Sequence, residues 1–351
     1  MAAFDSSDSW AGDVRLVAMS SSGDGEPLVT LEFSRTPRSG WLGELARHRC
    51  ASLSVESARA VPLNLVLQQI MSDPYVPMDM RVNGRGMESQ VQMEGKTLKQ
   101  AQFHWLKCRD SVVRHAADLV ALGGHKQDVS RLLEPWVRIR LVMSTTSLSS
   151  ILLLRMAPDV QPVFQHIARR MGACVKGVTP RILGEDEWHA PYCDISDDVS
   201  HEQMIQCVAR CARATYGRNG DVKTLAEDAS LVLRLMNADV PREYPCVGWD
   251  SESHGYIDTR ASTVQCVHAS PFEHVAAYRA NAPSRACDSG NFSSHWAQLR
   301  HCRYTLDAMV SRAREIHMAA IPDDFLYGVR RGEGYSYTCI ALVRECANRR
   351  T

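Results

Sequence analysis

The sequence lacks the features that would place the chain in a membrane or a secretory pathway. Its longest apolar run, residues 148–156, is far shorter than the roughly 20 residues of a membrane-spanning helix, and it contains Arg155. The first 13 residues are polar and acidic, whereas a signal peptide begins with basic residues and an apolar stretch. We therefore expect a cytoplasmic protein without a membrane partner.

The sequence also lacks a charge surplus and is poor in aromatic residues. Among its 351 residues, 40 are Lys or Arg and 40 are Asp or Glu, so the formal net charge is zero. Phe, Trp and Tyr make up only 7%. A protein that coats nucleic acid needs basic residues against the phosphates and aromatic rings for the bases, so we expect no nucleic-acid partner.

Metal-binding cysteine motifs are absent as well. The 12 cysteines are scattered, no Cys-x-x-Cys pair occurs, and no Cys/His cluster has zinc-finger spacing. Cys207 and Cys211 share one face of an expected helix. We predict buried free thiols in a reducing compartment and no metal site.

What the sequence does contain is a majority of helical segments and a minority of strands. Alternating apolar residues predict strands over residues 14–19 and 28–33. Apolar residues at three- and four-residue steps predict the helices, over residues 39–49, 64–71, 97–122, 125–133, 147–155, 159–171, 201–216, 222–237 and 303–319. We expect the segments 184–200 and 241–263 to be connecting loops. The fold class is then α+β, with helices packed on a mixed or antiparallel sheet.

The densest chemical signal is a run of basic residues followed by a hydroxyl group. Arg47, His48 and Arg49 precede Ser57 by a gap of seven residues, and Arg59 follows. Guanidinium groups bind phosphate oxygens in pairs, and a hydroxyl group donates to a further oxygen. The segment therefore suits a nucleoside monophosphate, although a basic triplet alone is more often a solvated surface.

The spacing Arg-His-Arg, seven residues, then Ser resembles the signature of flavin-dependent thymidylate synthases. A second block supports the resemblance with residues 128–131 (Asp-Val-Ser-Arg), then Pro135, Leu154-Arg155 and Val160-Gln161. A third block, residues 268–274 (His-Ala-Ser-Pro-Phe-Glu-His), is similar to the family's His-x-Ser-x-Phe-Glu-His, and residues 212–216 are similar to its Ala-Arg-x-Ser-Tyr.

The third block follows the first here, whereas it comes earlier in most members. The chain thus resembles a circularly permuted member of the kind found in bacteriophages and other viruses, which would act in the host cytoplasm. We expect the permuted catalytic domain over residues 1–302, with blocks 28–172 and 201–302 joined by the connection 173–200. Residues 303–351 would then be a C-terminal extension.

The resemblance implies an activity and its cofactors. The family transfers a one-carbon unit from methylenetetrahydrofolate to C5 of dUMP, and FAD carries a hydride that NADPH restores. The protein supplies position and electric field for this chemistry. The resemblance also implies a homotetramer whose subunits share active sites.

The resemblance assigns roles to individual residues. Arg131, Arg155 and Ser57 would be catalytic, and together with Arg59 they would bind the substrate. The residues implied for FAD and folate are Arg47, His48, Arg49, His268, Ser270 and Glu273.

Several positions depart from the family pattern and leave alternatives open. Ser54 and Val55 stand where many members have Asn and Glu, and Ser144 and Ser150 stand where Asn is frequent. Other departures are Thr146 for Arg, Asp159 for His, Val163 for Glu and Glu44 for Gln. The alternatives are a hydroxymethylase acting on dUMP or dCMP, and a nucleotide-binding interaction protein that has lost catalysis.

Overall fold

The computed structural model confirms the α+β class. It describes residues 10–23, 25–57, 61–85, 89, 91–193, 199–215, 223–236, 247–250, 255–258, 270–279, 291–292 and 295–320. The helices are α1 (Trp41–Leu45), α2 (Leu63–Ser72), α3 (Gly95–Ala121), α4 (Lys126–Leu133), α5 (Leu148–Arg155), α6 (Pro162–Val175), α7 (His201–Ala214), α8 (Leu225–Met236), α9 (Ser270–Glu273) and α11 (Arg303–Ala319). The strands are β1 (Asp13–Ser21), β2 (Leu28–Pro37), β3 (Ala51–Val55), β4 (Arg138–Thr145), β5 (Arg181–Ile182), β6 (Trp188–His189), β7 (Val247–Asp250), β8 (Gly255–Asp258), β9 (Ala276–Tyr278) and β10 (Trp296–Gln298).

A five-stranded mixed sheet forms the centre of the first half of the chain. Its strand order is β3-β4-β2-β1-β5, and every neighbouring pair is antiparallel except β1 with β5. Successive side chains of a strand point to opposite faces, so the sequence Ala-Ser-Leu-Ser-Val of β3 gives that strand one polar and one apolar face. The register places Ser52 opposite Ser144 and Ser144 opposite Thr30, so the polar face continues across three strands.

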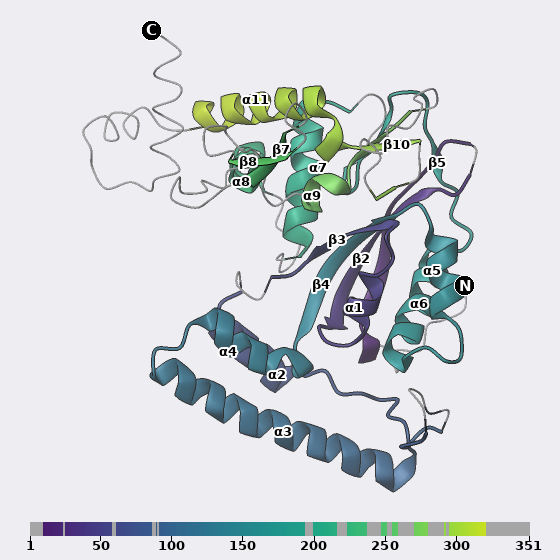
Figure 1. Cartoon of the computed structure of the whole chain (residues 1–351), viewed down its shortest axis with the longest axis vertical. Coiled ribbons are helices and arrows are strands. Elements are labelled where there is room, and N and C mark those ends of the chain that lie inside the picture. The colour runs from purple at the N-terminus through teal and green to yellow at the C-terminus, as the bar shows by residue number, and fades with distance from the viewer. Residues whose placement is uncertain are drawn as a thin grey trace.

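The apolar face of this sheet builds the larger core. Phe33 and Leu141 of the sheet lie in one buried cluster with Trp41 of α1, Ile70 of α2 and Phe164 of α6. Figure 1 shows α5 and α6 on one side of the sheet and α2 and α4 below its other end. Burying apolar area is the main stabilising contribution to a fold, so these helices fix the sheet and the loops at its ends.

A second core forms from the later part of the chain. Val208 of α7, Val232 of α8 and Met309 of α11 meet in a separate buried cluster. The three-stranded sheet β10-β9-β6 lies next to it. Helix α11 lies within the predicted extension 303–351 and packs on α7 and α8, whereas residues 321–351 lie outside the described residues.

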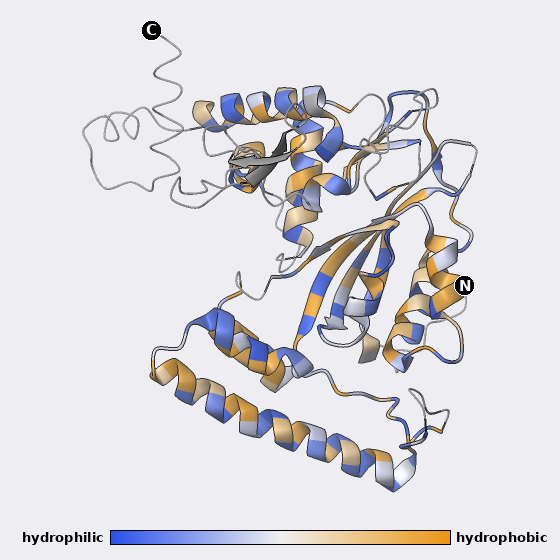
Figure 2. Cartoon of the chain, in the orientation of Figure 1, coloured by the Kyte–Doolittle hydropathy of each residue, from blue (hydrophilic) through white to orange (hydrophobic). Residues whose placement is uncertain are grey.

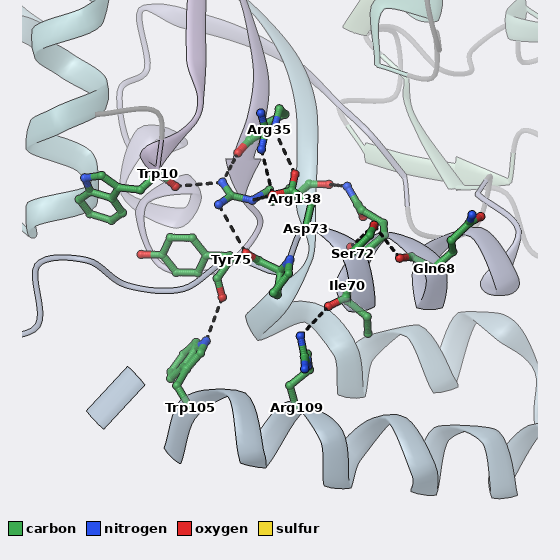
Figure 3. Close-up of polar contacts among 12 residues, drawn as sticks. Trp10, Arg35, Gln68, Ile70, Ser72, Asp73, Tyr75, Trp105, Arg109 and Arg138 are labelled. Carbon is green, nitrogen blue, oxygen red and sulfur yellow. Dashed lines mark hydrogen bonds and ion pairs between the residues drawn. The ribbon is translucent and has the colours of Figure 1, made fainter. Parts of the chain in front are cut away.

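Arg138 joins the first sheet to the helices below it, as Figure 3 shows. The side chain is 6% exposed, and its Nη1 donates to the carbonyl oxygens of Trp10 (2.9 Å) and Arg35 (2.7 Å). Its Nε lies 3.4 Å from Asp73 Oδ1, and Asp73 also accepts two hydrogen bonds from Arg35. The guanidinium of Arg138 lies over the ring of Tyr75, 5.8 Å from its centre. One buried cation therefore joins Trp10, strand β2 and the end of α2.

Helix α3 is the longest helix and confirms the prediction for residues 97–122. Only Ala116 is fully buried in it, and Trp105 donates through Nε1 to the carbonyl oxygen of Tyr75 at 2.9 Å. Figure 2 shows hydrophilic and hydrophobic residues mixed along the whole helix. Gly123 ends the helix with a positive φ of 85°. Among the described helices, none combines the length and the hydropathy that crossing a membrane requires.

The structure differs from the expected elements in several places. The predicted helix 39–49 is limited to α1, because the backbone turns at residues 46–50 to enter β3. Residues 51–55 and 138–145, for which no strand was predicted, form β3 and β4. The connection 173–200 includes the short strands β5 and β6, and the segment 241–263 includes the hairpin of β7 and β8.

Candidate functional site

The Arg-His-Arg segment lies in a tight turn between α1 and β3. Trp41 and Leu45 of α1 are fully buried and anchor the helix in the core. The backbone N–H of His48 donates to the carbonyl oxygen of Leu45 at 3.0 Å, and the N–H of Ala51 donates to that of His48 at 3.1 Å. This geometry leaves Arg47 and Arg49 exposed and His48 half-buried.

Arg155, the last residue of α5, reaches the same turn. Its Nε donates to Nε2 of His48 at 2.9 Å, and its Nη1 donates to Oε2 of Glu44 at 2.6 Å. The guanidinium also lies over the ring of Phe164, 5.0 Å from its centre. The structure thus brings together His48 and Arg155 from two motif blocks, with Glu44 as a third member.

Thr145, at the end of β4, connects the two segments that carry these residues. Its hydroxyl group donates to the carbonyl oxygen of Cys50 at 2.9 Å, directly after the Arg-His-Arg turn. The same oxygen accepts from the backbone N–H of Ser147 at 3.1 Å, at the start of α5. Because one buried hydroxyl group bonds both segments, the turn and α5 have a fixed relative position.

The electrostatics of this cluster keep His48 neutral. Burial lowers the pKa of the His48 imidazole below its usual value, the Arg155 guanidinium lowers it further, and the Glu44 carboxylate partly opposes both. These effects favour the neutral imidazole, whose Nε2 lone pair accepts from Arg155.

The third motif block packs behind the turn, on β3 and β4. His274 is fully buried, and it hydrogen bonds Ser54 through Nε2 at 2.9 Å and Ser144 through Nδ1 at 2.8 Å. Gln298 donates to Ser52 Oγ and to the carbonyl oxygen of Glu273, both at 2.9 Å. The block is therefore held on the polar face of the sheet. It contacts β3, the strand that follows the Arg-His-Arg segment in the chain.

The polar contacts continue across the sheet as an unbroken chain. Ser144 Oγ lies 2.6 Å from Thr30 Oγ1, which lies 2.7 Å from Nε2 of His189. Nδ1 of His189 lies 2.8 Å from Ser20 Oγ. Burial lowers the pKa of both His189 and His274 to about 3, so both rings are neutral.

The remaining predicted residues lie at other places in the chain. Ser57 follows the far end of β3, about 16 Å along the strand from the turn. Arg131 is exposed on α4, beside α2 and α3. Ser270 begins α9 and is half-buried. Arg59 and His268 lie outside the described residues, so their predicted roles stay predictions.

Glu273 and the Ala-Arg-x-Thr segment form ion pairs of their own. The Glu273 carboxylate accepts from Nη1 of Arg300. Arg213 of α7 donates to Asp228 of α8, which is 1% exposed. The contact of Arg213 holds two helices of the second core together.

Sequence reasoning missed two residues of this region. Glu44 stood out only as a departure from the family pattern, and its ion pair with Arg155 depends on the fold. His189 lies in a segment that was predicted to be a connection, and nothing near it in the sequence indicates its partners Ser20 and Thr30. Among the described residues, no group of three or more His, Cys, Asp or Glu side chains could hold a metal ion.

Neither a protein-family model nor a curated protein sequence matches this chain. It is similar to the solved structure of a flavin-dependent thymidylate synthase from Helicobacter pylori complexed with FAD and dUMP. The two are 21% identical with a TM-score of 0.30, over 43% of this chain and 69% of the other. It is also similar to a UMP/dUMP methylase from Streptomyces cacaoi bound with 5-bromo-UMP, at 18% identity and a TM-score of 0.34, over 42% of this chain and 67% of the other. The solved structures similar to this chain thus include flavin-dependent thymidylate synthases, the family that its three motifs resemble.

Proposed function

We propose that this chain is a flavin-dependent one-carbon transferase. It transfers a unit from methylenetetrahydrofolate to C5 of a pyrimidine deoxynucleoside monophosphate, with conversion of dUMP to dTMP as its main reaction. The observation that carries the proposal is the 2.9 Å hydrogen bond between Arg155 and His48. It joins two motif blocks 107 residues apart through the polar side chains that the resemblance assigns to ligands.

The donors at this turn fit the phosphate groups of FAD or of a nucleotide. Arg47 and Arg49 are exposed on either side of His48. Guanidinium groups form paired hydrogen bonds with phosphate oxygens and stay charged at every physiological pH. Flavin held here would supply the hydride in its reduced form, and NADPH would reduce it again. The resemblance implies that Glu273 contacts FAD. Because Glu273 is paired with Arg300, we propose that both side chains of the ion pair lie next to the flavin.

Arg155 would act on the pyrimidine ring. A fixed guanidinium near a ring carbonyl group stabilises the negative charge that develops as C5 becomes nucleophilic. The contacts with His48, Glu44 and the Phe164 ring fix Arg155 before any substrate arrives. Such preorganisation is what makes a charged group effective in a transition state.

A homotetramer with shared sites would supply the residues that one chain leaves apart. Ser57 and Arg131 lie away from Arg155 within the single chain. The exposed side chains of Leu153 and Leu154, 79% and 55% exposed, flank Arg155 on α5. Figure 2 shows α5 as largely hydrophobic. We propose that another subunit covers this helix and contributes its Ser57, Arg59 and Arg131 to the site.

One observation favours the second candidate, a hydroxymethylase of dUMP or dCMP or a nucleotide-binding protein without catalysis. Ser54 and Ser144 stand where many family members have Asn, and both hydrogen bond His274 in the interior. They are therefore not available to replace an amide group in a ligand contact. A pocket altered in this way suits another base, another product or binding alone.

The visible absorption spectrum of the purified chain tests the proposal first. Flavin bands that appear on adding FAD, and that shift when dUMP follows, are the expected result. A chain that cannot be loaded with FAD contradicts the flavoenzyme proposal.

Turnover assays then separate the two candidates. The chain is given labelled methylenetetrahydrofolate and NADPH, with dUMP in one reaction and dCMP in another. The mass of the product distinguishes a methyl from a hydroxymethyl group. Flavin and nucleotide binding without any labelled product would favour the protein that has lost catalysis.

A further inference from the structure

The arrangement at Arg155 determines which nitrogen of His48 carries the proton. An arginine Nε always bears a hydrogen, so it can only donate. The partner atom, His48 Nε2, must therefore accept with its lone pair at 2.9 Å. A neutral imidazole has one N–H, and in His48 it lies on Nδ1.

The Nδ1–H of His48 makes no hydrogen bond to any of the described residues. In this part of the chain the only hydrogen bond of the imidazole is the one from Arg155. Its neighbours Arg47 and Arg49 are cations and cannot accept a hydrogen bond. A ligand oxygen, from a carbonyl or a phosphate group, is a partner that suits an N–H donor in this basic segment.

Glu44 holds this arrangement in place. Its carboxylate accepts from Arg155 Nη1 at 2.6 Å, and its backbone oxygen lies 3.5 Å from Nη2. The guanidinium is thus bonded on two edges, with the Phe164 ring against its plane. Without the carboxylate, Arg155 would lose its shortest hydrogen bond and keep only the bond to His48, the long contact to the backbone oxygen of residue 44 and the ring contact, so it could rotate away.

We propose that Glu44 is a positioning residue that holds Arg155 on His48, so that His48 presents an Nδ1–H donor to an acceptor oxygen of the nucleotide or flavin. This inference rests on the proposed function in taking the turn as the ligand site. It assigns His48 a donor role rather than that of a general base, because its only lone pair is occupied by Arg155.

Nitrogen NMR of the imidazole rings in the free protein tests the tautomer. His48→Gln identifies the resonances of His48 among the 13 histidines. We expect the Nδ1–H form in the unaltered chain. A neutral ring protonated on Nε2 would overturn the proposal.

Two variants of Glu44 separate positioning from charge. In Glu44→Gln the amide oxygen still accepts from Arg155, so the Nδ1–H form should remain, and the pKa of His48 should fall because the carboxylate that raises it is gone. In Glu44→Ala the guanidinium is released, so a mixture of tautomers should appear. A spectrum unchanged in Glu44→Ala would overturn the positioning role. The matched control is Glu202→Gln, which removes a 2.6 Å ion pair with Arg312 far from the site and should leave His48 unchanged.

Binding experiments then identify the acceptor. Inorganic phosphate, deoxyuridine, dUMP and FAD are added separately while the His48 Nδ1–H resonance is followed. A shift with phosphate and dUMP assigns a phosphate oxygen, and a shift with deoxyuridine assigns a ring carbonyl group. Binding of dUMP or FAD that moves other resonances but leaves His48 unchanged would overturn the donor role.

Activity gives an independent measure. Loss of positioning by about 1 Å costs on the order of 100-fold in rate, so Glu44→Ala should lose about that factor and Glu44→Gln much less. If no ligand binds at all, the proposed function fails, whereas the tautomer measured in the free protein still decides the role of Glu44.

Discussion

At the scale of single residues, the candidate site is a set of donors whose directions are fixed before a ligand arrives. Arg155 uses its planar fork in three ways: one edge bonds His48, another bonds Glu44, and the face lies on Phe164. A lysine could provide the charge, but it has neither the rigid planar fork nor the flat face that these contacts use. The identity of the side chain therefore matters more than its charge.

Replacing Arg155 tests this difference. Arg155→Lys should lower kcat/KM nearly as much as Arg155→Gln, by about 100- to 1,000-fold, because the oriented donors are lost in both. Steady-state kinetics measure the effect. Arg312→Gln, on an exposed part of α11, should leave kcat/KM unchanged. Full activity in Arg155→Lys would show that charge alone is sufficient.

The two buried histidines predict a pH dependence of stability. Their pKa of about 3 in the folded chain lies below the unfolded value of about 6.5, so the unfolded chain binds more protons between these limits. Their contribution is complete above about pH 6.5 and is lost as the pH falls towards 3. As the pH falls through this window, each ring should lower the free energy of unfolding by about 1.4 kcal/mol per pH unit.

Urea unfolding at several pH values measures this slope. In His274→Gln the slope should be smaller by about the contribution of one ring, although the variant is less stable at every pH. His115→Gln, which changes a histidine on the surface of α3, is the control and should keep the full slope. An unchanged slope in His274→Gln would contradict a neutral buried ring.

At the scale of elements, a helix or strand could be predicted from the sequence where its pattern of apolar and polar residues is regular. The helices α2, α3, α4, α7 and α8 have one apolar face against a core, and the sequence located all of them within a few residues. Strand β4 has buried residues on both faces, so its sequence Arg-Ile-Arg-Leu-Val-Met-Ser-Thr lacks a clean alternation. Strands β6, β9 and β10 are two or three residues long, too short for any period.

Arg138 at the start of β4 predicts a large local effect. Arg138→Met removes the side-chain donor of two backbone carbonyl groups, those of Trp10 and Arg35. A hydrogen bond from a charged group contributes about 1.5–3 kcal/mol, so losing both should lower the unfolding free energy by about 3–5 kcal/mol. Denaturant unfolding measures the loss. Arg312→Met is the matched exposed control and should leave the midpoint almost unchanged. An equally small effect of Arg138→Met would contradict the role of Arg138 in connecting Trp10, β2 and α2.

At the scale of the whole molecule, two apolar cores meet through a polar surface. The sheet presents Ser52, Ser54, Ser144 and Thr30 to His274, His189 and Gln298 of the later half. The sequence predicted which blocks belong together only through the resemblance. The contact surface itself could not be predicted, because a serine in a strand is equally compatible with solvent.

Removing one hydroxyl group at this surface should destabilise the packing of the later half of the chain on the sheet. Ser144→Ala leaves Nδ1 of His274 and the hydroxyl group of Thr30 without their shared partner, which costs about 1–3 kcal/mol. Hydrogen exchange should then accelerate in residues 270–279 while the apolar core of β2 and α6 stays protected. The control Ser72→Ala removes an exposed hydroxyl group and should change neither region. Uniform acceleration over the whole chain would contradict two separately stabilised cores.

The polar face of the sheet also bears on how the chain is synthesised. His274 leaves the ribosome 130 residues after Ser144, which at about 5–20 residues per second is a delay of roughly 6–26 s. During this time β1 to β4 can fold on their apolar core with one face uncovered. That face carries hydroxyl groups, which water can hydrogen bond until the histidines arrive. We therefore expect this face of the nascent chain to have little tendency to aggregate while the second half is being translated.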